Sequence, residues 1–167
     1  MASSDEVLRH VIEKYRSLEK PDFHWVREEY ERDPFAALRA ALGSRFDVAD
    51  VTDLNSDVSF AYDLKPIEGD GKWTLRLSMV GPYATLVRHQ PRTPSETIVD
   101  GPADARSPFE SLVLEACASA EYELLSRDVL RLPVKLRLFE TSPERVRVYQ
   151  ALFSDVDFLP GEYGETR

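Results

Sequence analysis

The acidic residues of this sequence are the ones whose type and spacing most resemble those of a functional site. Asp47, Asp50, Asp53 and Asp57 follow one another at intervals of three, three and four residues. Residues 47–70 contain seven acids and a single base, so this stretch carries −6 of the formal net charge of −9. On a helix the four carboxylates would share one face, and on a loop they would still concentrate negative charge. The pattern favours attraction of a basic protein partner, although such a run is also typical of a solvated face.

A second acidic pair, Asp155 and Asp157, follows a predicted strand. The Asp-x-Asp spacing occurs in aspartyl-nucleophile phosphatases and metal-binding glycosyltransferases, but the pair alone is a weak signal for either chemistry. We expect these carboxylates to solvate a turn or to contact a partner. The residues predicted to bind a partner are Asp47, Asp50, Asp53, Asp57, Asp155 and Asp157.

The segment from Asp53 to Asp57 also has the D-x-N-x-D opening of an EF-hand calcium loop. The sixth position of that loop would be Val58, where the tight turn needs glycine. The twelfth would be Leu64, where a bidentate glutamate is needed. Both departures exclude a calcium loop, and the segment is interpreted as a polar approach to the first predicted strand.

No other constellation specifies a reaction. His10, His24 and His89 have no metal-ligand spacing with another His or with Cys. No Gly-x-Ser-x-Gly elbow is present. Cys117 falls on the apolar stripe of a predicted helix, where a buried, inert thiol is expected. The sequence therefore predicts no catalytic residue, no metal and no cofactor.

The cysteine content and the N-terminal residues indicate the cellular compartment. A single cysteine excludes an internal disulfide. Asp5 and Glu6 stand where a signal peptide would have its basic region, and no apolar region follows. The longest uncharged run, residues 77–87, is far shorter than the roughly 20 residues of a membrane span. A cytoplasmic protein is expected.

Helical periodicity predicts the elements that would position these side chains. One helix is expected over residues 5–18 and a short one over residues 23–30. Asp33-Pro34 is a typical helix start, with an acidic N-cap followed by proline, and Gly43 is a typical helix end. The longest predicted helix runs from about Phe109 to Leu125.

Alternation of apolar and polar residues predicts strands over residues 58–64, 73–79 and 83–89. Short connections between them favour an antiparallel meander. Residues 134–139 and 146–153 also alternate and are predicted as two further strands. The second of these assignments is open, because Ser142-Pro143-Glu144 is also a typical helix start.

Blocks of helices and strands, rather than strict alternation of the two, predict an α+β fold. We expect a single domain over residues 1–167, with an antiparallel sheet packed against helices and a frayed tail from about residue 160. Helix 109–125 is expected to cover the sheet. The residues expected in the core include Leu112, Val113, Ala116, Phe60, Tyr62, Trp73, Leu75 and Leu77.

Two stretches resemble small bacterial proteins encoded beside polymorphic toxin genes. Residues 77–87, with Gly81-Pro82-Tyr83 between two predicted strands, are similar to the strand, Gly-Pro-Tyr/Phe, strand segment of those proteins. Residues 148–155, followed by Asp157 and Pro160, resemble their closing segment. The resemblance implies an immunity protein, which is a dedicated inhibitor that binds a toxin and blocks it. It carries no catalytic residue over.

The functional expectation is a non-enzymatic immunity protein that binds a cognate toxin, such as a basic nuclease, and occludes its active site. The net negative charge argues against nucleic acid or an anionic membrane surface as the partner. Two alternatives are open. One is a small ligand-binding domain or enzyme with a pocket under the proline-rich loop at residues 90–108, and the other is an oligomeric adaptor protein.

Overall fold

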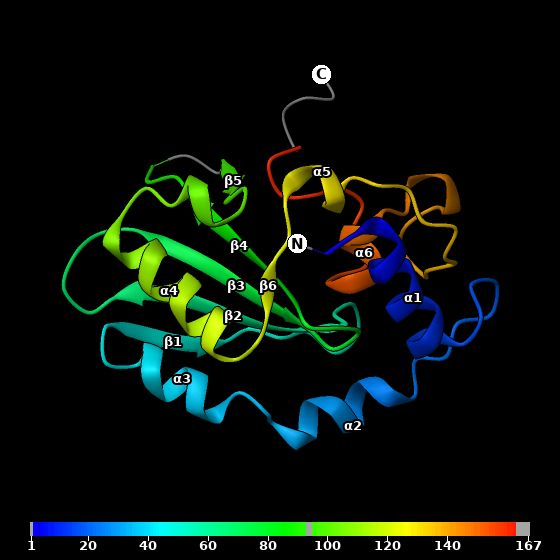
Figure 1. The fold of residues 1–167 in the computed structure, drawn as a ribbon, viewed down its shortest axis with the longest axis horizontal. Helices are drawn as coiled ribbons and strands as arrows, with labels where there is room; N and C mark the ends of the chain where they lie inside the picture. Colours follow the sequence, from blue (N-terminus) through cyan, green and yellow to red (C-terminus); the bar gives the residue numbers. More distant parts are fainter. Residues whose placement is uncertain (1, 93–94, 163–167) are drawn as a thin grey trace.

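Alternating apolar side chains build a sheet around which the chain is organised. The computed structural model describes residues 2–92 and 95–162. The first five strands form an antiparallel meander in the order β1-β2-β3-β4-β5, and β6 lies parallel beside β4 (Figure 1). The predicted α+β fold with an antiparallel meander is confirmed. The strands are β1 (Phe46–Asp50), β2 (Ser59–Pro66), β3 (Lys72–Ser78), β4 (Tyr83–His89), β5 (Glu96–Ile98) and β6 (Glu123–Leu124).

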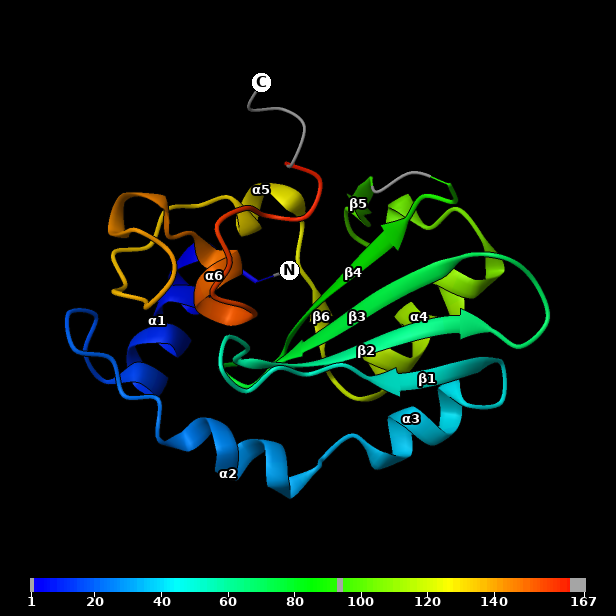
Figure 2. The same cartoon turned by 180° about the vertical axis from the view of Figure 1, so that it is seen from behind.

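Helices cover one face of this sheet and lie beside one end of it. α4 lies over one face, and the opposite face is seen in front of it when the molecule is turned around (Figures 1 and 2). α1 and α6 lie beside the sheet in both views. The helices are α1 (Ser4–Tyr15), α2 (Trp25–Arg32), α3 (Ala36–Leu42), α4 (Pro108–Ser119), α5 (Arg127–Leu130) and α6 (Val148–Leu152), with short 3-10 turns η1 (Pro102–Asp104) and η2 (Pro143–Arg145).

The strand register separates an apolar face from a polar one. Phe60 pairs with Leu77, and Leu75 pairs with both Tyr62 and Leu86, so these buried side chains share one face. Directly opposed residues in an antiparallel pair point to the same side. The intervening residues, including Thr74 and Arg76, therefore form the other face.

The end of the polar face is closed by the last residue of α6 and the residue that follows it. The hydroxyl of Ser59 donates to the carbonyl oxygen of Phe153 at 2.8 Å. The hydroxyl of Ser78 donates to the carbonyl oxygen of Leu152 at 2.7 Å. Both serines are buried, and these hydrogen bonds satisfy side chains that would otherwise be costly to enclose.

A buried carboxylate joins α4 to the sheet. Glu110 is 1% exposed and accepts from Arg88 Nη2 at 2.5 Å, Arg88 Nε at 2.7 Å and Trp73 Nε1 at 2.9 Å. Burial opposes ionisation of this carboxyl, but the hydrogen bonds from Arg88, the Arg106 N–H and Trp73 outweigh it and lower the pKa of Glu110. A paired and hydrogen-bonded charge is the form in which a buried carboxylate is tolerated.

Capping explains where the helices begin, and in one case corrects the prediction. Ser3 caps α1 by accepting from the Glu6 N–H at 3.2 Å, which confirms the predicted first helix. The prediction that Asp33 caps the third helix is wrong. Asp33 has left-handed backbone angles (φ 48°, ψ 62°) and ends α2, while its carboxylate pairs with Arg39. α3 therefore begins later, at Ala36.

The long helix is shorter than predicted because the chain changes direction after Ser119. Glu121 has a positive φ of 61°, and the following residues enter the sheet as β6. Within α4, Val113 is buried as expected, whereas Leu112 and Ala116 are only partly buried. The core residues expected on the strands are buried: Phe60, Tyr62, Trp73, Leu75 and Leu77.

The two strands predicted near the C-terminus are wrong. Residues 134–139 form no strand, and of the two alternatives left open for residues 146–153 the structure has the helix, α6 over Val148–Leu152, rather than the preferred strand. The side-chain Oε1 of Gln150 accepts from the Arg147 N–H at 2.9 Å, which fixes the start of this helix. All five residues of α6 are buried, so its sequence has no polar face from which a helical period could be recognised.

The described part of the chain ends at Glu162. Residues 163–167 of the predicted frayed tail lie outside the described residues, and Glu162 before them accepts from Arg147 Nη1 at 2.6 Å. None of the helices in residues 2–92 and 95–162 has the length and apolar content that a membrane span requires.

Candidate functional site

Three of the predicted partner-binding residues lie together on the first strand and the turn that follows it. Asp47 and Asp50 belong to β1, and Asp53 lies in the turn after it. All three are exposed, and within the described part of the chain none forms an ion pair. We call these three residues the acidic edge. The helix considered for them in the sequence is replaced by an edge strand that pairs with β2 alone among the described strands.

Local hydrogen bonds hold two of these carboxylates in place. Asp50 accepts from the Tyr30 hydroxyl at 2.8 Å and from the Thr52 N–H at 3.0 Å, and the bond to Asp50 raises the pKa of Tyr30. Asp53 accepts from the Asn55 N–H at 3.0 Å. Asp-based turns of this kind position the carboxylate without neutralising it. The negative charge of the acidic edge thus faces solvent.

Asp57 has a different role from the one expected. It is 4% exposed, and one carboxylate oxygen accepts from Ser154 Oγ at 2.7 Å and lies 3.0 Å from Arg76 Nη1. The other oxygen accepts from the Asp53 N–H at 2.8 Å. With both oxygens bonded inside the protein, Asp57 contributes no exposed surface to a partner.

Asp155 is likewise internal. It is 9% exposed and accepts from three consecutive backbone N–H groups, of Phe139, Glu140 and Thr141, and from the Thr141 hydroxyl. These bonds fix the irregular segment around residue 140 against the end of α6. The sequence offered no signal for this, because the donors are backbone groups far from Asp155 along the chain.

Asp157, the sixth predicted residue, is exposed and lines a groove of about 430 Å³. We call it the C-terminal groove. Its walls come from β3, the start of β5, α6 and the segment at residues 154–161. The residues that line it are Arg76, Glu96, Tyr149, Ser154, Val156, Asp157, Phe158, Leu159, Pro160 and Gly161.

A chain of hydrogen bonds crosses three strands on the polar face of the sheet. An ionised carboxylate can only accept, so the Thr74 hydroxyl donates to Asp63 at 2.7 Å. The Thr74 oxygen is then the acceptor for His89 Nε2, also at 2.7 Å. This assigns the proton of the neutral imidazole to Nε2 and turns the Nδ1 lone pair towards Glu96, 3.7 Å away. His89 therefore does not act as a base towards Thr74.

Burial lowers the pKa of His89, and the nearby Lys72 ammonium adds to this effect, while Glu96 and Asp63 oppose it. The neutral imidazole is therefore favoured in the folded protein. In the sequence, His89 is one of three histidines, and no motif connects it with Thr74 and Asp63. The alternation of apolar and polar residues places Asp63 and Thr74 on the polar face of adjacent strands. This alternation is the one sequence signal that could have indicated their hydrogen bond.

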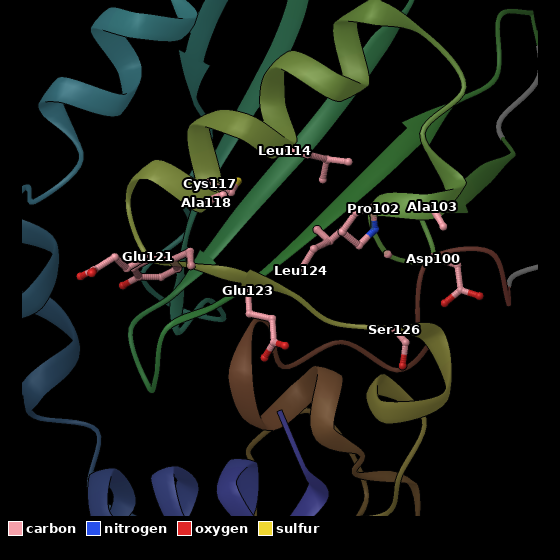
Figure 3. A pocket seen from close by; sticks show the side chains of 12 residues that line it. Asp100, Pro102, Ala103, Leu114, Cys117, Ala118, Glu121, Glu123, Leu124 and Ser126 are labelled. Carbon is pink, nitrogen blue, oxygen red and sulfur yellow. The ribbon is translucent and has the colours of Figure 1, made fainter. Parts of the chain in front are cut away.

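A cavity of about 580 Å³ lies under the proline-rich loop (Figure 3). We call it the loop cavity. Asp100, Pro102 and Ala103 line it from the loop, and Leu114 and Cys117 line it from α4. Glu121, Glu123 and Leu124 close it from the chain that enters and forms β6. The walls are mainly apolar, with carboxylates at the border, which suits a small apolar ligand.

Cys117 is 1% exposed, and burial raises the pKa of its thiol to about 12. A nucleophilic cysteine requires a thiolate, which a basic neighbour or a helix N-terminus would favour. The structure therefore supports the expected role of Cys117 as a packed, protonated side chain.

In residues 2–92 and 95–162, no group of three His, Cys, Asp or Glu side chains is arranged to hold a metal ion. No family model, curated protein or solved structure matches this chain.

Proposed function

We propose that this chain is a binding protein that captures a basic protein partner through its acidic edge, and that it acts as an immunity protein towards a bacterial toxin. The single observation that supports this most is the placement of Asp47, Asp50 and Asp53. They follow one another along one edge of the sheet, with Asp47 and Asp50 on opposite faces of β1, and they are exposed and free of ion pairs within the described residues. The residues assigned to this role are now these three, because Asp57 and Asp155 are buried and the exposed Asp157 lines the separate C-terminal groove.

The physical basis is electrostatic steering. A cluster of uncompensated charge raises the rate at which an oppositely charged protein is encountered. A nuclease toxin needs a basic surface to attract phosphate, and a row of carboxylates presents similar charge to that surface. The proposed mechanism is occlusion of the toxin's substrate groove, without chemistry on either protein.

The position on an edge strand adds a second contribution. Edge strands have backbone groups that are not paired within their own sheet, and acidic side chains deter pairing with another copy of the same chain. A basic partner would meet both favourable charge and unpaired backbone groups along β1. The same carboxylates would discourage self-association of this acidic protein.

The test requires a partner and a matched pair of variants. Affinity capture from the native cell should yield one basic protein, which is then purified, assayed for toxicity and bound in vitro. The triple variant Asp47→Asn, Asp50→Asn, Asp53→Asn removes charge while keeping oxygen acceptors for the local turns. Association at low salt should slow by roughly tenfold or more, and its dependence on salt should weaken.

The control variant changes the same number of exposed charges elsewhere: Glu115→Gln, Asp128→Asn and Glu144→Gln. It should retain most of the association rate. Equal slowing in both variants would show that net charge acts without a defined surface. Unchanged association in the triple variant would remove the acidic edge from the interface, and a captured protein whose toxicity is not inhibited would remove the immunity function.

The loop cavity favours a second candidate function, binding of a small apolar molecule. Its volume of about 580 Å³ falls in the range of ligand pockets. A neutral fluorescent naphthylamine should bind with enhanced emission, and Ala118→Phe should fill the cavity and reduce that signal. The exposed α3 variant Ala37→Phe is the matched control. Absence of enhancement in the unmodified protein would exclude this function.

A further inference from the structure

We propose that the C-terminal groove binds a cationic amino acid, a small molecule with one carboxylate and two ammonium groups. The site is separate from the acidic edge, and the inference does not depend on the proposed partner protein. It rests on donors in the depth of the groove and carboxylates at its border.

Arg76 supplies the first set of donors. Its side chain is 19% exposed, and its Nη1 is used by Asp57 at 3.0 Å and by Ser59 Oγ at 3.4 Å. Nε and Nη2 make no hydrogen bond with the described residues, and the side chain lines the groove. A guanidinium with two such donors is suited to a carboxylate, which accepts two parallel hydrogen bonds.

Tyr149 supplies an additional donor and is the strongest sign that the groove is built for a ligand. Tyr149 is 2% exposed and lines the groove, but its hydroxyl makes no hydrogen bond with any described residue. A side chain so largely buried normally has its polar atom satisfied, and a molecule in the groove would supply the missing partner. Arg76 and Tyr149 line the same groove, so the two donors serve one region.

Two carboxylates decide the charge of the ligand. Glu96 and Asp157 line the same groove and are both exposed, so they lie at its border. Asp57 already compensates Arg76, and the groove therefore has a net negative charge. A simple anion would be repelled by Glu96 and Asp157, whereas a simple amine would leave the donors of Arg76 and Tyr149 unpaired.

A cationic amino acid satisfies both requirements. Its carboxylate would accept from Arg76 and Tyr149, and its two ammonium groups would lie near Glu96 and Asp157. The apolar side of the groove, which includes Leu159 and Pro160, would contact the methylene chain. The groove's volume of about 430 Å³ is sufficient for such a molecule.

The experiment is titration calorimetry of the full chain with L-lysine and with two molecules that each lack one of its groups. 1,5-Diaminopentane lacks the carboxylate, and 6-aminohexanoate lacks the α-ammonium group. L-lysine should bind, and each analogue should bind at least roughly tenfold more weakly, because each leaves charged partners unsatisfied. Equal binding of 1,5-diaminopentane would overturn the proposal in favour of general attraction of amines.

Tyr149→Phe is the decisive variant, because the hydroxyl it removes has no partner among the described residues. Thermal unfolding should be nearly unchanged, and L-lysine affinity should fall roughly tenfold. Tyr122→Phe, which removes a hydroxyl outside the groove, should retain binding. Asp157→Asn should also weaken binding, whereas the triple variant of the acidic edge should not. No heat of binding with L-lysine at about 10 mM, or full affinity in Tyr149→Phe, would overturn the proposal.

Discussion

The Ser154 hydroxyl donates to the carboxylate of Asp57 at 2.7 Å, across 97 positions of the sequence. This hydrogen bond, together with the ion pair between Asp57 and Arg76, joins the end of α6 to the approach to β2. An aspartate expected on the surface is thus a tertiary link.

Removing this link should be strongly destabilising. Asp57→Ala would leave the largely buried Arg76 without its carboxylate, and breaking such a pair costs about 3 kcal/mol or more. Urea denaturation should show the loss as a lower midpoint with an unchanged slope. Asp157→Ala, an exposed acid, should change the free energy of unfolding by no more than about 0.5 kcal/mol. Similar losses in the two variants would contradict the assignment.

Stability should fall as the solution becomes acidic, partly because of His89. Burial lowers the pKa of His89 in the folded state, so the unfolded state takes up the proton more readily. Its contribution is therefore present above the unfolded pKa of about 6.5 and is lost as pH falls through the lower folded value. Free energies of unfolding measured between about pH 7.5 and 5 should decline less steeply in His89→Gln than in the unmodified protein. An equal decline in the two proteins would contradict this prediction.

Thiol labelling should report unfolding rather than surface chemistry. Cys117 is 1% exposed, and its pKa is raised to about 12, so little thiolate is available at neutral pH. A chromogenic disulfide reagent should react slowly with the folded protein and rapidly after addition of denaturant. Fast reaction under native conditions would show that the loop cavity admits the reagent to α4.

Truncating a leucine on the sheet should cost more stability than truncating one on α4. Leu75 is fully buried, so Leu75→Ala should cost about 2–5 kcal/mol. Leu112 is only partly buried on α4, and Leu112→Ala should cost roughly half as much. Thermal or urea denaturation of the two variants checks the order, and an equal loss would show that Leu112 is as enclosed as Leu75.

The sequence predicted the elements whose two faces differ. β2, β3 and β4 were recognisable because buried Phe60, Tyr62 and Leu75 alternate with polar residues, and α1 because its stripe and its cap agree. β1 was missed because Asp47 and Asp50 dominate its pattern. α6 was not distinguished from a strand, because all its residues are buried and no polar face marks a helical period.

The candidate site was predicted only where exposure follows from local sequence. Asp47, Asp50 and Asp53 are exposed as expected for a charged run. Asp57 and Asp155 also stand among polar and acidic residues, as the three exposed acids do. Their burial, however, depends on Arg76, Ser154 and the backbone near Thr141, which only the tertiary structure brings close to them. The unpartnered hydroxyl of Tyr149 likewise has no counterpart in any sequence pattern.

The cover that residues 152 and 153 place over Ser59 and Ser78 has a consequence for biosynthesis. The serines leave the ribosome long before the carbonyl groups that accept their hydrogen bonds. Until residues 152 and 153 have been synthesised, the sheet lacks those partners and Arg76 lacks the segment beside it. Long-range contacts of this kind slow folding. The nascent chain therefore completes this part of its native structure only after residues 152 and 153 have been synthesised, and products that stop before them would expose the end of the sheet to quality-control proteases.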